Sequence, residues 1–107
     1  MKIPRSSFAL LVALLLLPST LLAEVHEVQV FFGLKFVPAT ITIAPGDTVR
    51  WVWISSGGHD VESGRRGVRN GFFSSGGEKD SGTFEVRFTN KFLRRNRVRN
   101  GVYHYFC

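Results

Sequence analysis

The chain has 107 residues, enough for one small domain. Its 14 basic residues outnumber the eight acidic ones, giving a formal net charge of +6, and its single cysteine, Cys107, excludes an internal disulfide bond. No nucleophilic triad, paired carboxylates or phosphate-binding loop is found in the sequence, so we do not expect an enzyme.

Residues 1–23 are typical of a secretory signal peptide. Lys2 and Arg5 give a positive start, an apolar run follows from Phe8 to Leu17, and the segment ends on the small residue Ala23. A proline and a serine interrupt the run well short of the roughly 20 apolar residues of a membrane-spanning helix, which favours cleavage over an uncleaved anchor. We therefore expect no membrane span after signal cleavage.

The expected product is an exported domain, periplasmic or secreted, that comprises residues 24–107. Two of the 14 basic residues leave with the signal peptide, so 12 remain against eight acidic ones and the domain stays basic at +4. A lone thiol outside the cytoplasm needs a role: Cys107 pairs with another chain, binds metal as a thiolate, or belongs to a sequence that is missing its remainder.

Apolar and polar residues alternate from Val25 onward, as is typical of half-buried β-strands. Three strands are predicted before residue 54. Their apolar faces contain Val28, Val30 and Phe32 in the first, Ile41 and Ile43 in the second, and Val49, Trp51 and Trp53 in the third. The turn residues 44–47, with the sequence Ala-Pro-Gly-Asp, predict that the second and third strands are neighbours.

Residues 55–82 are mostly glycine, serine and charged residues, which predicts loops with at most one short helix or strand. Alternation resumes at residues 83–88, and a final strand after Gly101 places Tyr103, Tyr105 and Cys107 on one face. We find no helical periodicity outside the signal peptide. Short strands separated by turns predict an all-β sandwich or barrel.

Four side chains offer metal or nucleophile chemistry: His26, His59, His104 and Cys107. His59 follows the loop glycines Gly57 and Gly58, although a single loop histidine is more often solvated than a ligand. Cys107 ends a buried strand, where a structural cysteine is the simpler interpretation. His104 precedes it by three residues and should face the opposite way, so we exclude His104 as a partner of the thiol.

The order and spacing of many elements resemble the plastocyanin/azurin family of cupredoxins. The resemblance covers nearly all of residues 25–107. The elements that carry it are Pro38–Ile43, Gly46–Val49, Trp51, His59, Val61, Thr83, Phe84, Phe88, Gly101, Tyr103, Tyr105 and Cys107. It implies a Greek-key β-sandwich with a type 1 copper site, which holds one ion and exchanges one electron between Cu(I) and Cu(II).

The family's site uses two histidines, a cysteine thiolate and a weak axial methionine. The resemblance assigns the first histidine to His59 and the thiolate to Cys107. The second histidine and the methionine belong to the loop directly after the cysteine, and this sequence has no such loop. The family's final strand has no counterpart either. We therefore expect a fragment with an incomplete site in a sandwich that lacks its final strand.

The sequence also differs from the family between Thr89 and Gly101, where the family has a short turn. Residues 90–100 include Arg94, Arg95, Arg97 and Arg99, which would either dock an acidic redox partner or form a solvated loop.

Three functions remain open: an electron carrier, a copper-binding or copper-delivery module without redox cycling, and a basic β-sandwich that binds an anionic partner. The third would use Arg65, Arg66 and Arg69 together with the later arginines. It is the least favoured, because the aromatic residues alternate as in a core and the signal peptide directs the chain away from nucleic acid.

Overall fold

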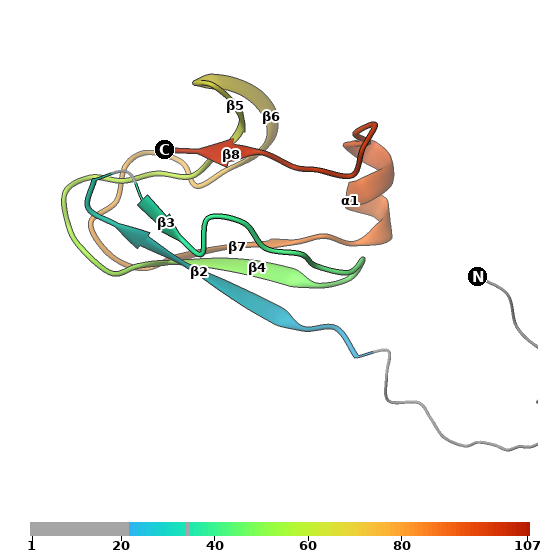
Figure 1. The fold of residues 1–107 in the computed structure, drawn as a ribbon, viewed down its shortest axis with the longest axis horizontal. Helices are drawn as coiled ribbons and strands as arrows, with labels where there is room; N and C mark the ends of the chain where they lie inside the picture. Colours follow the sequence, from blue (N-terminus) through green and yellow to red (C-terminus); the bar gives the residue numbers. More distant parts are fainter. Residues whose placement is uncertain (1–21, 34) are drawn as a thin grey trace, which may run out of the picture.

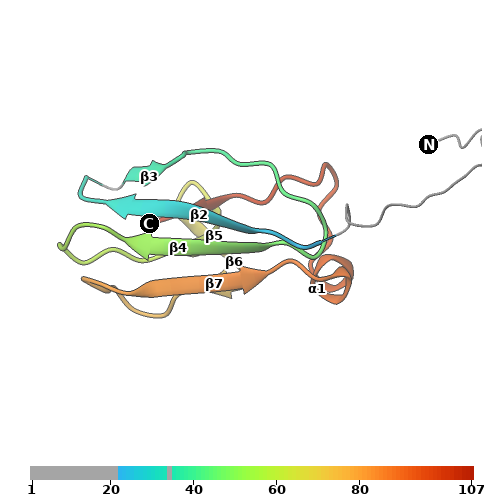
Figure 2. The same ribbon diagram turned by 90° about the horizontal axis from the view of Figure 1, so that it is seen from below.

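The structure, a computed structural model, describes residues 22–33 and 35–107 and folds them into two facing β-sheets (Figure 1; Figure 2). The predicted signal peptide lies outside the described residues except for its last two positions. No helix within the described part of the chain is long and apolar enough to cross a membrane.

One sheet has four strands in the order β3-β2-β4-β7, and the other has three in the order β6-β5-β8. The strands are β2 (Val25–Phe31), β3 (Lys35–Val37), β4 (Thr48–Trp53), β5 (Glu62–Arg65), β6 (Val68–Ser74), β7 (Thr83–Arg87) and β8 (Tyr105–Phe106), and the helix α1 (Asn90–Arg95) precedes β8. The architecture agrees with the predicted β-sandwich, with one short helix in addition.

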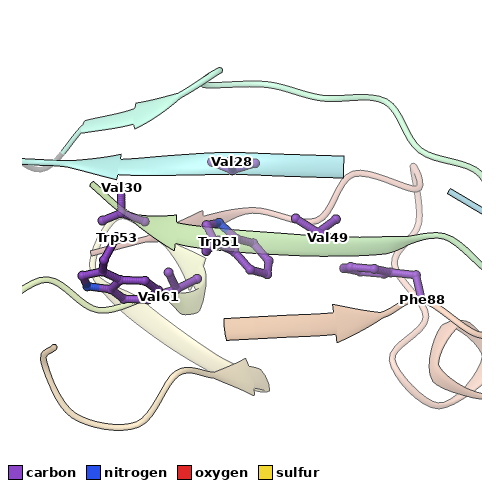
Figure 3. Packing of buried hydrophobic residues seen from close by; sticks show 7 residues of the cluster. All are labelled: Val28, Val30, Val49, Trp51, Trp53, Val61 and Phe88. Carbon is purple, nitrogen blue, oxygen red and sulfur yellow. The ribbon is translucent and has the colours of Figure 1, made fainter. Parts of the chain in front are cut away.

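The core lies between the sheets and is centred on Trp51, which is 1% exposed (Figure 3). The pleat of β2 and β4 turns alternate residues inward. The buried apolar side chains are Val28, Val30, Val49, Trp51, Trp53, Val61 and Phe88. The ring of Trp51 stacks on Phe84 of β7, with centroids 5.5 Å apart, and meets the edge of Tyr105 of β8 at 5.2 Å. Trp51 therefore joins the four-stranded sheet to the strand that leads to Cys107.

Two details of the first part of the sandwich differ from the sequence predictions. Residues 40–43 form no strand: Ile41 and Ile43 pack against the core, but their backbone joins no ladder among the described residues. The neighbours of β4 are instead β7, which is antiparallel to it, and β2, which runs parallel to it with Val28 opposite Trp51. Phe32 follows the last residue of β2 and is 67% exposed, so the predicted inward face ends at Val30.

The second half contains more regular structure than predicted. Residues 55–82 include two strands, β5 and β6, which form a hairpin whose tip residues Arg66 and Gly67 have φ of 53° and 77°. Two successive positive φ angles are typical of a tight hairpin turn, whose usual sequence is asparagine followed by glycine. Here arginine stands in place of asparagine, so the sequence did not indicate the turn. Residues 90–95 form α1 rather than a loop; six residues are too few to show helical periodicity.

The carboxylate of Asp47 fastens the start of β2 to the turn before β4. It is 5% exposed and accepts hydrogen bonds from the backbone N–H of Glu24 at 3.0 Å and of Ala44 at 3.0 Å. The His26 ring nitrogen Nε2 lies 2.8 Å from the same carboxylate. These bonds, led by the one from Glu24, hold the pKa of Asp47 at about 2, below the ordinary 3.8.

We predict that Asp47→Asn lowers stability at neutral pH and removes part of its acid dependence. The folded-state pKa is depressed, so the contribution of the carboxylate is complete above the ordinary pKa of 3.8 and disappears as the pH falls toward about 2. In urea unfolding followed by tryptophan fluorescence, the wild-type and variant midpoints should converge between pH 5 and about 2. Glu24→Gln, which removes an exposed carboxylate nearby, should leave the midpoint within error; equal behaviour of the two variants would contradict the prediction.

Candidate metal centre

The loop between β4 and β5 is held in place by residues from the segment before β7. The backbone N–H of His59 donates to the carbonyl of Lys79 at 3.0 Å, and the Lys79 N–H donates back at 2.8 Å. The indole Nε1 of Trp53 also donates to the His59 carbonyl at 3.0 Å. The Asp80 carboxylate accepts from the N–H of Gly57 at 3.1 Å and of Gly58 at 2.9 Å. The backbone around His59 is therefore fixed on both sides.

The imidazole of His59 has one nitrogen in use and one free. The residue is 3% exposed, and its Nε2 lies 3.3 Å from the carbonyl oxygen of Ser56. A carbonyl only accepts hydrogen bonds, so in a neutral ring this contact places the proton on Nε2 and leaves the lone pair on Nδ1. Nδ1 is buried and has no hydrogen-bond partner among the described residues. A buried nitrogen lone pair without a partner is the form in which histidine binds a metal.

Cys107 lies against the same loop. Gly58 and Asp60, the residues on either side of His59, line a hollow of about 690 Å³ together with Cys107 and Glu78. Burial raises the pKa of the Cys107 thiol; the backbone of Asp60 acts in the opposite direction, and the charges of Asp60 and Glu78 add to the increase. The thiol is thus protonated at neutral pH until a cation compensates the negative surroundings.

A sequence profile described as copper binding proteins of the plastocyanin/azurin family matches residues 24–107. The chain belongs to this family. Among curated proteins, none matches the sequence. The family resemblance stated from the sequence is thereby confirmed. Proteins of this family bind copper, and the imidazole and the thiol at the His59 end of the sandwich are donor types that suit this metal.

The other two histidines of this cupredoxin do not join the site. His26 is bound to Asp47 at the start of β2, whereas His59 follows the far end of β4. His104 is exposed, and its neighbours Tyr103 and Tyr105 turn toward the core, as the strand alternation predicted. Among residues 22–33 and 35–107, no three His, Cys, Asp or Glu residues gather closely enough to hold a metal ion. The His59 imidazole and the Cys107 thiol are donor types that suit copper, but two donors are too few for a four-ligand site.

Sequence reasoning missed the residues that support the histidine. Lys79 and Asp80 lie in a stretch of glycine, serine and charge with no sign that it pairs with the loop some 20 residues earlier. The available signal was general: aspartate often accepts backbone N–H groups in glycine-rich loops. The partner segment is set by tertiary structure, so the sequence pattern could not identify it.

We predict that Gly57→Ala disturbs the His59 loop. Gly57 has φ of 124°, where a side chain is strained, and a Cβ would lie 3.6 Å from His59 Nε2. The cost should be about 1–2 kcal/mol of unfolding free energy. Gly77→Ala is the matched control, since that position has no positive φ and nothing within 4 Å of an added Cβ. Urea unfolding of both variants tests the idea, and equal stabilities would refute it.

Proposed function

We propose that this chain is an exported, one-electron carrier that holds a single copper ion through Nδ1 of His59 and the thiolate of Cys107. The observation that supports the proposal most directly is the unpartnered, buried Nδ1 of His59, next to the residue that contacts the Cys107 thiol. A buried polar atom without a partner costs free energy, and a metal ion is the partner that its lone pair would accept.

The surrounding residues suit such a site. When copper is bound by imidazole and thiolate, it supplies one-electron exchange between Cu(I) and Cu(II). The Ser56 carbonyl keeps the proton on Nε2 of His59. The hydrogen bonds from Gly57 and Gly58 to the Asp80 carboxylate limit movement of the loop. Burial and the charges of Asp60 and Glu78 raise the pKa of the Cys107 thiol, and a bound cation would offset these charges and stabilise the thiolate. An imidazole that is held in place moves little between the two oxidation states, which favours electron exchange.

Two donors do not complete a type 1 site, so we also propose that its further ligands come from outside the described residues. The hollow beside Cys107 is open to solvent and bordered by Gly58 and Val68, which leaves room for them. The same observation favours a second candidate function, a copper-binding or copper-delivery module that takes its remaining ligands from a partner and does not cycle the metal.

We predict that Cu(II) gives the full chain an intense visible absorption band from thiolate-to-copper charge transfer, and that added imidazole strengthens the band by supplying a further nitrogen ligand. Cys107→Ser should abolish the band, and His59→Gln should reduce it at least ten-fold. His104→Gln is the matched control, because His104 is exposed and points away from the core. A band that His59→Gln leaves unchanged would disprove the proposed ligands.

The two candidate functions differ in what happens to the bound copper when it is reduced. After ascorbate reduction, the bound copper is counted by metal analysis of the desalted protein. Retention of the copper together with return of the band on reoxidation supports an electron carrier; release of Cu(I) supports delivery. We also propose that the protein is exported and that it exchanges electrons with an acidic redox partner protein.

A further inference from the structure

A second hollow, of about 360 Å³, lies at the α1 end of the sandwich, and the copper site does not use it. Its lining comes from residues 43–45 before β4, from α1 with the loop that follows, and from the stretch that leads to β8. Phe88, a residue of the buried core, lines it as well, so the hollow reaches the core. Small-molecule sites in proteins commonly have volumes of about 300–1,000 Å³, and this hollow lies within that range.

The lining is apolar apart from one cation. Ile43, Leu93 and Val98 contribute half-buried aliphatic surface. Arg97 is the one charged residue among the described residues that line the hollow. It is exposed and takes part in none of the ion pairs within the described part of the chain. An apolar wall beside an unpaired guanidinium favours a ligand that combines an apolar body with one negative group.

The charges that the chain exposes next to the hollow are positive. Residues 90–100 contain four further exposed cations, namely Lys91, Arg94, Arg95 and Arg99. No aspartate or glutamate occurs in residues 86–107. The Asp47 carboxylate, just beyond the turn before β4, is buried and already accepts two backbone N–H groups. The resulting positive field attracts anions to this end of the molecule.

The apolar wall selects among these anions. An inorganic anion, or a polyanion that stays hydrated, gains the electrostatic attraction but leaves the wall in contact with water. An amphiphilic organic anion gains the attraction and also removes apolar surface from water, both its own and that of the hollow. A neutral apolar molecule of the same shape gains only the second contribution. The lining therefore favours the amphiphilic anion over either alternative.

Hydrogen bonds hold the walls of the hollow in position. On one side, the Gly46 N–H donates to the Phe88 carbonyl at 2.7 Å, and the Phe88 N–H donates to the Asp47 carbonyl at 2.8 Å. On the other side, the Tyr103 hydroxyl donates to the Asn96 carbonyl at 2.7 Å, just after α1. The hollow is thus formed before a ligand arrives, which lowers the ordering cost of binding.

This hollow and the metal centre lie at different ends of the sandwich. Both views show α1 at the end opposite the carboxyl terminus (Figure 1; Figure 2). The strand β4 runs between these ends, from Thr48 to Trp53, a rise of about 17 Å. A ligand in the hollow therefore leaves Cys107 uncovered and does not compete with copper.

We propose that the hollow binds a small organic carboxylate whose apolar body has about ten carbon atoms and whose carboxylate pairs with Arg97. A cavity of about 150 Å³ holds one benzene molecule, so 360 Å³ accommodates two fused rings or an aliphatic chain of similar size. A guanidinium binds a carboxylate through two parallel hydrogen bonds, which fixes the orientation of the ligand. This binding goes beyond the proposed electron transfer and does not depend on it.

The test titrates the full chain, without added copper, with 2-naphthoate, with its neutral analogue 2-naphthylmethanol and with acetate. Two-dimensional amide NMR spectra give both the dissociation constant and the place of contact. We expect 2-naphthoate to bind with a Kd of about 1 mM or lower, and each of the other two probes to bind about ten-fold more weakly. The shifted amide signals should come from residues 43–46 and 93–101, and that of Gly58, which borders the hollow beside Cys107, should stay in place.

The variant Arg97→Gln should weaken 2-naphthoate binding about ten-fold and leave 2-naphthylmethanol binding unchanged. Arg99→Gln is the matched control, because it removes the same charge two residues away from a side chain that does not line the hollow. It should weaken binding less than about two-fold. The spectra without ligand check that both variants are folded.

Equal losses in the two variants would show attraction by net charge alone. Equal affinity for 2-naphthoate and 2-naphthylmethanol would show apolar binding without recognition of the carboxylate, and shifts confined to other residues would place the ligand elsewhere. Each of these results, or no binding at all, overturns the proposal. Neither variant changes His59 or Cys107, so the copper absorption band tests the proposed function separately.

Discussion

The contact between the two sheets through Trp51 is the constraint on which the rest of the molecule depends. Its indole meets Phe84 in the four-stranded sheet, and Phe73 and Tyr105 in the three-stranded one, with centroids 5.2–5.5 Å apart. A large, buried aromatic residue contributes through area and through ring geometry. Because Tyr105 stands two residues before Cys107, the position of the thiol depends on a residue whose sequence position is more than fifty residues earlier.

Much of the first sheet could be predicted from the sequence, because its strands bury one face and so alternate strictly. Val28, Val49 and Trp51 illustrate this: each was expected inside and each is buried. Ile41 and Ile43 show the limit. Alternation reports which side chains face a core, whereas a strand also needs a neighbour with which to share hydrogen bonds, and these residues have none among the described ones.

The donor residues of the candidate site could be predicted from the sequence, whereas the hydrogen bonds that orient them could not. A glycine-flanked histidine and a lone cysteine can be read from the sequence, and the family resemblance assigned them roles. The sequence does not show which ring nitrogen of His59 is free, because that depends on the contact with the Ser56 carbonyl. It also does not show that the His59 loop is held in place, because that depends on the hydrogen bonds to Asp80. Both depend on contacts between loops, where local propensity carries little information.

β8 is the strand with the fewest pairs in its sheet. Only two residue pairs connect it to β5: Glu62 with Phe106 and Ser63 with Tyr105. The loop of His59 is, in contrast, fixed by several hydrogen bonds. An ion held between these two segments would be linked thermodynamically to strand docking, because a ligand that binds only the docked state stabilises that state by mass action. Metal binding and the local unfolding of β8 would then be coupled in one equilibrium. The bound ion would add most stability to β8, which is the more weakly paired edge of the sandwich.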